Sequence, residues 1–198
     1  MRFEIDRIAK DDMQVLGPGK RMEIWLHGCQ RRCPGCIIET HNREEEPMLS
    51  LSVNVLMNYL SEDAEIEGVT ISGGEPFLQA DALLCFSKLL HEKHFGIILY
   101  SGYTYQELQD LPLGKDVLAF VDVLVDGPYI QELDDGVAYR GSSNQKIYCF
   151  TDRYVDYFSD CNRKRKCYIK QQGAYLSLTG IPDRRSRQIW NQLKSKGE

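Results

Sequence analysis

Residues 69–76 read Val-Thr-Ile-Ser-Gly-Gly-Glu-Pro, a short β-rich run that meets two glycines, an acidic residue and a proline. The segment that follows carries apolar side chains at helical spacing, at Leu78, Ala82, Leu83, Phe86, Leu89 and Leu90. We therefore predict a strand, a tight turn and a helix, which together form the repeating unit of α/β proteins.

Strand signals continue on both sides of this segment. Phe3 and Ile5 alternate with polar residues, and further strands are predicted at residues 22–26, 97–100 and 121–126. Because these later runs are almost continuously apolar, they favour a parallel sheet that is covered by helices.

Two predicted helices begin with capping signals. An apolar stripe over residues 53–60 predicts an amphipathic helix that Ser50 or Ser52 caps. A third helix is predicted to begin at Thr104, whose hydroxyl can form a capping box with Glu107. Helices thus alternate with the predicted strands, and the fold class is α/β.

The C-terminal part has a different pattern. It predicts a strand at residues 145–150, a hairpin with arms at 167–170 and 174–179, and a terminal helix over 184–194. A chain of 198 residues is close to one domain at about 150 residues per domain. We therefore predict a single domain over residues 1–198, with a core at about 15–150 and an extension at 151–198.

Composition and charge exclude several classes of protein. Hydrophobic residues make up 42% and charged residues 27%, and 24 basic and 29 acidic side chains leave a net charge of −5, so nothing favours nucleic acid as a partner. No apolar run approaches the roughly 20 residues that span a bilayer, and the first residues lack the apolar core of a signal peptide. We predict a cytoplasmic protein without a membrane partner.

Seven cysteines in a cytoplasmic chain indicate metal or redox chemistry, because the number is odd and reducing conditions keep thiols free. Cys29, Cys33 and Cys36 form C-x3-C-x2-C on a loop rich in glycine and proline. Three thiolates can hold a cluster of four irons and leave one iron open. They can also complete a Cys3His zinc site with His27 or His41. Spacing alone leaves both alternatives open.

Gly73, Gly74, Glu75 and Pro76 form the second candidate group. Glycines after a strand let the backbone approach a ligand, and a glutamate can accept hydrogen bonds from an ammonium group. The alternative is a strand-to-helix turn in which Glu75 is a solvated cap. In a parallel α/β protein this turn lies at the same edge as the cysteine loop.

The two motifs together, in this order, resemble the radical S-adenosylmethionine (SAM) superfamily. More narrowly, the chain resembles the activating enzymes of glycyl radical enzymes, above all those of anaerobic ribonucleotide reductase. The likeness rests on GPG at 17–19, WLHGC at 25–29, CPGC at 33–36, ISGGEPF at 71–77, DVLVDGP at 122–128 and RGSSNQ at 140–145.

The resemblance implies a partial (β/α)6 radical SAM barrel with a C-terminal hairpin and helix extension. It implies a 4Fe-4S cluster on Cys29, Cys33 and Cys36, with SAM bound to the open iron. The residues that it implies for SAM are Gly73, Gly74 and Glu75 at the amino group, Ser101 and Asp126 along the ribose and carboxylate, and Gly35 near the adenine. Pro76 belongs to the same cofactor-binding motif, where it fixes the turn into the helix. For Asp126, the alternative is a turn cap at the end of a strand.

The resemblance also implies the chemistry and the partners. One electron from a flavodoxin-like donor reduces the cluster and cleaves SAM to methionine and a 5'-deoxyadenosyl radical, which removes a hydrogen atom from a glycine of anaerobic ribonucleotide reductase. No catalytic acid or base in a side chain is therefore expected. Two alternatives are an activator or modifier of another protein or peptide, and a non-catalytic zinc or iron-sulfur interaction module.

The other cysteines are predicted to be incidental. Cys85 falls among the apolar positions of the second helix and is expected to be a small buried hydrophobe. Cys149, Cys161 and Cys167 supply only three thiols at loose spacing, so we expect no auxiliary cluster. His27 is expected to lie in the core or behind the metal ligands.

Overall fold

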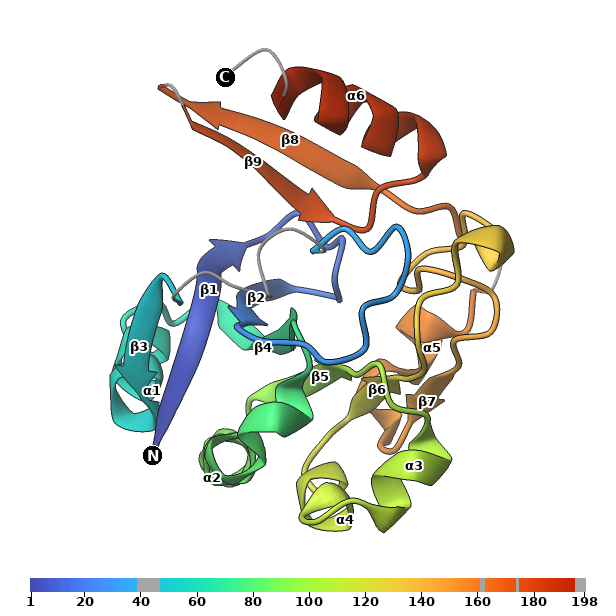
Figure 1. Cartoon of the computed structure of the whole chain (residues 1–198). Coiled ribbons are helices and arrows are strands. Elements are labelled where there is room, and N and C mark those ends of the chain that lie inside the picture. The colour runs from blue at the N-terminus through green and yellow to red at the C-terminus, as the bar shows by residue number, and fades with distance from the viewer. Residues whose placement is uncertain (39–46, 161–162, 174, 195–198) are drawn as a thin grey trace.

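The central sheet is mixed, and its parallel strands include those that the sequence predicts (Figure 1). The computed structural model describes residues 1–38, 47–160, 163–173 and 175–194. Within these residues the large sheet has the order β3-β1-β2-β4-β5-β6-β7. Its strands are β1 (Arg2–Asp11), β2 (Lys20–Leu26), β3 (Leu49–Ser52), β4 (Ile66–Gly73), β5 (Gly96–Tyr100), β6 (Val123–Val125) and β7 (Ile147–Cys149).

Helices separate the parallel strands along the chain. They are α1 (Val53–Ser61), α2 (Ala80–Glu92), α3 (Tyr105–Asp110), α4 (Gly114–Leu118), α5 (Val155–Phe158) and α6 (Arg184–Lys194), with short 3-10 helices η1 (Pro76–Gln79), η2 (Gln131–Leu133) and η3 (Asp152–Tyr154). A second sheet is formed by β8 (Cys167–Gln172) and β9 (Tyr175–Gly180). The predicted C-terminal hairpin and terminal helix are thereby confirmed.

The barrel expected from the resemblance is confirmed only in its coarser form. Strands β2, β4, β5 and β6 run parallel, whereas β1, β3 and β7 pair antiparallel with their neighbours. Antiparallel neighbours need no crossover helix between them, and β1 reaches β2 through the short segment 12–19. The structure is a mixed α/β sheet with a parallel centre, and a sixfold βα repeat is not confirmed.

Both predicted helix caps are present. The Ser52 hydroxyl accepts a hydrogen bond from the Val55 amide at 3.3 Å, so Ser52 rather than Ser50 begins α1. At α3, the Thr104 hydroxyl accepts from the Glu107 amide at 3.2 Å and the Glu107 carboxylate accepts from the Thr104 amide at 2.6 Å. This reciprocal pair is the predicted capping box. Such local signals suffice to place a helix start because their partners lie within one turn.

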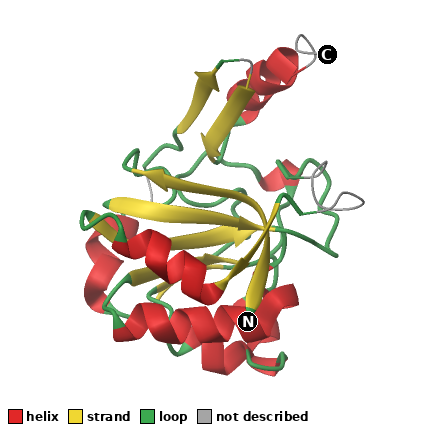
Figure 2. Ribbon diagram, turned by 90° about the vertical axis from the view of Figure 1, so that its left-hand side faces the viewer, coloured by secondary structure: helices red, strands yellow, loops and turns green. Residues whose placement is uncertain are grey.

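The main core lies between the sheet and helices α1 to α4, which cover one of its faces (Figure 2). On β2, Met22, Ile24 and Leu26 alternate toward this core and are at most 1% exposed. Leu83 and Phe86 of α2 meet them from the helix side and are fully buried. Burial of these apolar side chains is the main force that holds α2 against the parallel strands.

The C-terminal extension packs over the edge of the sheet where the cysteine loop lies (Figure 1). Arg7 of β1 donates hydrogen bonds to the Leu178 carbonyl at 2.5 Å and to the Thr179 hydroxyl at 2.8 Å of β9. The Ala138 amide donates to the Arg163 carbonyl at 2.8 Å. The extension therefore joins the core through backbone and arginine contacts. In the described part of the chain, no helix has the length and apolarity to cross a membrane.

Replacing Leu83 with Ala should lower the free energy of unfolding by about 2–5 kcal/mol, because the leucine is fully buried and truncation leaves a cavity. The exposed Leu78 is the matched control, and Leu78→Ala should change stability by no more than about 0.5 kcal/mol. Urea titration of both variants measures the difference. Equal losses would contradict the packing described above.

Candidate active site

The three predicted cysteine ligands lie on one short loop after β2. Gly28 and Gly35 adopt positive φ values of 90° and 69° in this loop, which glycine tolerates without strain. The Cys36 amide donates to the Cys33 carbonyl at 3.1 Å and tightens the second half of the loop. The thiols of Cys29, Cys33 and Cys36 are all free. Local backbone geometry thus gathers three thiols at one edge of the sheet.

These cysteines share a cavity of about 170 Å³ with the loops that follow β4 and β5. On the opposite side, its walls include Gly73, Gly74, Glu75 and Ser101. The cavity therefore brings together seven of the ten residues that the sequence predicts for the site, and it lies where the parallel strands end. In parallel α/β folds, ligands bind at this edge because the loops there are free to differ while the strands hold them in place.

A close backbone approach connects the two motifs. The Gly74 amide donates to the Leu26 carbonyl at 2.7 Å, and the Glu75 amide donates to the Gly28 carbonyl at 2.8 Å. A Cβ atom on Gly74 would lie 1.9 Å from the Gly28 oxygen, and one on Gly73 would lie 2.2 Å from the Leu26 nitrogen. The glycines are therefore needed for contact with the cysteine loop, and the amides of Gly74 and Glu75 are donated to backbone rather than to a ligand.

Glu75 is a buried carboxylate that connects three segments. It is 1% exposed, and it accepts hydrogen bonds from the Phe77 amide at 3.1 Å, the Ser101 hydroxyl at 2.9 Å and the Gly102 amide at 2.7 Å. It does cap η1, as the alternative interpretation required, but it is buried rather than solvated. An ionised carboxylate has about four acceptor positions, so one is left for a donor in the cavity.

Burial raises the pKa of Glu75 above its ordinary value of 4.5, although the three hydrogen bonds and the positive charge of Arg31 act in the opposite direction. The ionised form is therefore short of positive charge in its surroundings. A cationic ligand group beside it would lower this cost. Of the other predicted residues in this loop, Pro76 is buried and begins η1 rather than lining the cavity.

Asp126 and Gly35 lie outside the cavity lining. The Asp126 carboxylate is 3% exposed and accepts from the Tyr105 amide at 2.6 Å and the Lys146 amide at 2.9 Å, which supports the alternative of a cap at the strand end. A Cβ atom on Gly35 would meet the Gln131 side chain at 2.3 Å. Gly35 is thus packed against a neighbouring loop, and its predicted approach to adenine stays a prediction.

The histidines of the zinc alternative are placed elsewhere or are not described. The His27 Nδ1 atom lies 2.6 Å from Asp6 Oδ1, and His27 is not part of the cavity lining. His41 lies outside the described residues. Within the described ranges, no three Cys, His, Asp or Glu side chains are grouped as they would be around a single metal ion.

The remaining cysteines are not part of this cavity. Cys85 packs against the core as predicted but is only partly buried, while Cys149 is exposed on β7 and Cys167 is half-buried on β8. Cys161 lies outside the described residues. None of the three described thiols lines the cavity that Cys29, Cys33 and Cys36 share.

The side chains of the cavity that the predicted site residues did not include are, among others, Arg31, Tyr129 and Arg187. Arg31 lies between the first two cysteines, and its guanidinium donates to Glu107 at 3.1 Å and covers the Tyr103 ring at 4.3 Å from the centroid. Its position within the cysteine motif could have drawn attention to it. Arg187 comes from α6, which is remote in sequence, so no local pattern could have placed it here.

Gly74→Ala should separate the two loops, because the new methyl group would collide with a backbone oxygen that cannot rotate away. We expect a loss of about 1–3 kcal/mol of stability and weaker iron binding after anaerobic reconstitution. Gly136→Ala is the control: it introduces strain at a φ of 71° without a neighbour within 4 Å. Full iron content in Gly74→Ala would show that the close approach is dispensable.

Glu75→Gln should remove a pH dependence of stability. A carboxyl whose pKa is raised by folding stabilises the protein below its ordinary value of 4.5, and this contribution is lost as the pH rises through the folded value. As the pH rises from 4.5 through the pKa of Glu75 in the folded protein, the free energy of unfolding of the unsubstituted protein should therefore fall. The fall should be about 1.4 kcal/mol for each unit by which folding raises this pKa. Urea titrations of both proteins at several pH values test this, and parallel curves would contradict it.

Two comparisons with known proteins concern the family and the solved structures that resemble this chain. Residues 15–148 match the family model of the 4Fe-4S single cluster domain. A search of solved structures finds QueE from Escherichia coli with a TM-score of 0.45 and 18% identity, over 52% of this chain and 54% of that chain.

Curated relatives of this chain include several proteins named anaerobic ribonucleoside-triphosphate reductase-activating protein. The protein of Enterobacteria phage T4 is 31% identical over 74% of this chain and 94% of its own length. Those of Vibrio cholerae and Escherichia coli K12 are each 32% identical, over 69% and 68% of this chain and 92% and 91% of theirs. The chain belongs to the 4Fe-4S single cluster domain family, as a homologue of the anaerobic ribonucleoside-triphosphate reductase-activating proteins.

Proposed function

We propose that this protein is a radical SAM activase that generates the glycyl radical of anaerobic ribonucleotide reductase. One observation carries the proposal: a loop with three free cysteines and a buried glutamate face one cavity at the end of the parallel strands. Family membership and the names of the relatives support the same activity.

The residues around the cavity fit the cofactors that this function requires. Cys29, Cys33 and Cys36 provide three thiolates, which can ligate three irons of a 4Fe-4S cluster and leave the fourth iron for SAM. Glu75 keeps one acceptor position, and the effect of burial on its pKa outweighs that of the Arg31 charge, so the ammonium group of SAM suits it. When bound, the cluster supplies the electron that cleaves SAM and begins the radical chemistry.

The protein's own groups then have defined tasks. Ser101 orients Glu75 through its hydroxyl, and the Gly102 amide fixes the second carboxylate oxygen. Gly73 and Gly74 keep this carboxylate close to the cysteine loop. Because no step needs a proton from a side chain, the protein contributes binding, orientation and exclusion of water.

The finer features predicted from the sequence belong to this proposal. We infer a single domain whose parallel strands are part of a (β/α)6-type barrel. Asp126 acts near the SAM ribose by holding the backbone amides of Tyr105 and Lys146 in place, not by contacting SAM with its carboxylate. A flavodoxin-like electron donor and a cytoplasmic location complete the proposal. The four parallel strands and the reducing conditions that a cluster requires support it.

Cys33→Ala should abolish both iron binding and SAM cleavage, because two thiolates hold a cluster far less well than three. Cys149→Ala removes an exposed thiol that is remote from the cavity and should leave both intact. The measurements are iron per chain after anaerobic reconstitution and 5'-deoxyadenosine formed with dithionite and SAM. Zinc in place of iron, or cleavage by Cys33→Ala, would refute the proposal.

The target is tested separately. Incubation of the reduced protein with SAM and anaerobic ribonucleotide reductase should produce the electron paramagnetic resonance doublet of a glycyl radical. SAM cleavage without this signal would favour the alternative of another protein or peptide as the target. Absence of both would favour a non-catalytic interaction module.

A further inference from the structure

Arg187 is carried into the candidate active site by the C-terminal extension. It lies on α6, beyond residues 15–148 that match the family model, yet it lines the cavity together with the three cysteines. Its Nη1 atom lies 3.4 Å from the position that a Cβ atom would take on Gly35, the residue before Cys36. The guanidinium is therefore adjacent to the backbone of the cysteine loop.

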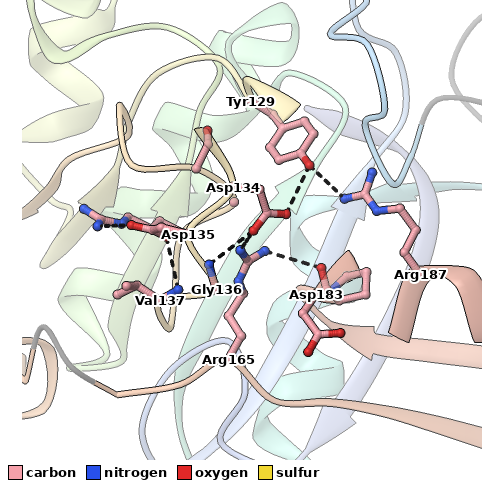
Figure 3. A network of polar contacts seen from close by, with 12 residues as sticks. Tyr129, Asp134, Asp135, Gly136, Val137, Arg165, Asp183 and Arg187 are labelled. Carbon is pink, nitrogen blue, oxygen red and sulfur yellow. Dashed lines mark hydrogen bonds and ion pairs between the residues drawn. The ribbon is translucent and has the colours of Figure 1, made fainter. Parts of the chain in front are cut away.

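A network of polar contacts holds this guanidinium in place (Figure 3). Arg187 Nη2 donates to the Tyr129 hydroxyl at 3.3 Å, and its guanidinium lies 5.2 Å from the centre of that ring. The Tyr129 hydroxyl donates to Asp134 Oδ2 at 3.2 Å. Tyr129 and Asp134 belong to the segment after β6, so α6 is connected to the core through a chain of defined acceptors.

The same acidic residue also binds the beginning of the extension. Arg165 forms an ion pair with Asp134, and their side chains are 2% and 4% exposed. Arg165 Nη1 donates in addition to the Pro182 carbonyl at 3.3 Å, just before α6. The Asp183 carboxylate accepts from the Ser186 amide at 2.7 Å and caps the helix. The orientation of α6, and with it the place of Arg187, is thus fixed by two contacts: that of Arg165 just before the helix and that of Tyr129 with Arg187 itself.

A fixed positive charge at this place has a physical consequence for a metal cluster. Reduction adds a negative charge to a centre that three thiolates already make electron-rich. A nearby cation in a partly buried site stabilises the reduced form more than the oxidised form. Charge, hydrogen bonding and solvent exposure are the main variables by which proteins adjust cluster potentials.

We propose that Arg187 raises the reduction potential of the cluster held by Cys29, Cys33 and Cys36, and that the extension serves to position it. The inference rests on the cluster of the proposed function but not on SAM cleavage or on the identity of the target. Tyr129 is a positioning residue, because its neutral hydroxyl holds the guanidinium in place and brings no charge of its own to the cysteines.

Redox titration of the anaerobically reconstituted full-length protein, without SAM, tests the proposal. Arg187→Gln removes the charge and should shift the midpoint potential to a more negative value. Arg187→Lys keeps the charge and should restore most of the difference. Since mobile ions screen charges, high salt should narrow the gap between the unsubstituted protein and Arg187→Gln.

Arg184→Gln is the matched control, because Arg184 is exposed on the same helix and does not line the cavity. It removes the same net charge and should leave the potential unchanged. An equal shift in Arg184→Gln would overturn the proposal, because it would show a general effect of net charge. An unchanged potential in iron-loaded Arg187→Gln would overturn it as well.

Iron content is measured first for each variant. If Arg187→Gln binds no cluster, Tyr129→Phe decides, because it removes the hydroxyl acceptor and leaves the arginine in the chain. Its potential should shift in the negative direction by less than a full charge removal, and an unshifted potential would overturn the proposal. A protein whose potential responds as expected but which does not cleave SAM would contradict the proposed function and not this inference.

Discussion

The approach of the Gly74 backbone to the end of β2 is the constraint on which the site depends. Two hydrogen bonds, from the amides of Gly74 and Glu75 to the carbonyls of Leu26 and Gly28, leave no space for a side chain between the loops. Parallel pairing of β2 with β4 brings Leu26 opposite Gly73 in register, so the approach is a continuation of the sheet. The cysteine loop therefore begins at a position that the strands define.

Glu75 extends this constraint to the next strand. Its carboxylate receives donors from the loop after β5, at Ser101 and Gly102, and so holds that loop against the one after β4. Such a buried carboxylate is costly unless donors and positive charge surround it. The hydrogen bonds supply part of this compensation, and the cavity beside Glu75 is where a cation can supply the rest. The carboxylate that stabilises the loop is thus the same group that we propose for binding the ligand.

The predictable and unpredictable parts of the structure differ in the sequence distance between the interacting groups. Ser52 and the capping box of Thr104 are predictable because the donor and the acceptor lie three residues apart. The three cysteines and the Gly73–Pro76 turn are predictable because each motif is local and the parallel sheet places both at one edge. Asp126 accepts hydrogen bonds from amides about 20 residues away, and Arg187 of α6 lines the cavity from a remote part of the sequence. Both depend on tertiary contacts that no local pattern encodes.

On the face of the sheet opposite helices α1 to α4, the protein's own side chains fill the space around Arg21. Arg21 is 1% exposed there and donates to the Thr70 hydroxyl, the Gly96 carbonyl and the Tyr154 hydroxyl at 2.9, 3.1 and 2.9 Å. A Cβ atom on Gly96 would lie 1.9 Å from the Tyr154 oxygen, so this face is filled by the protein's own side chains. The cavity that holds the cysteines is instead lined by the loops at the strand ends. The extension adds Ile181 and Arg187 to this lining, so it contributes one apolar and one charged side chain to the cavity.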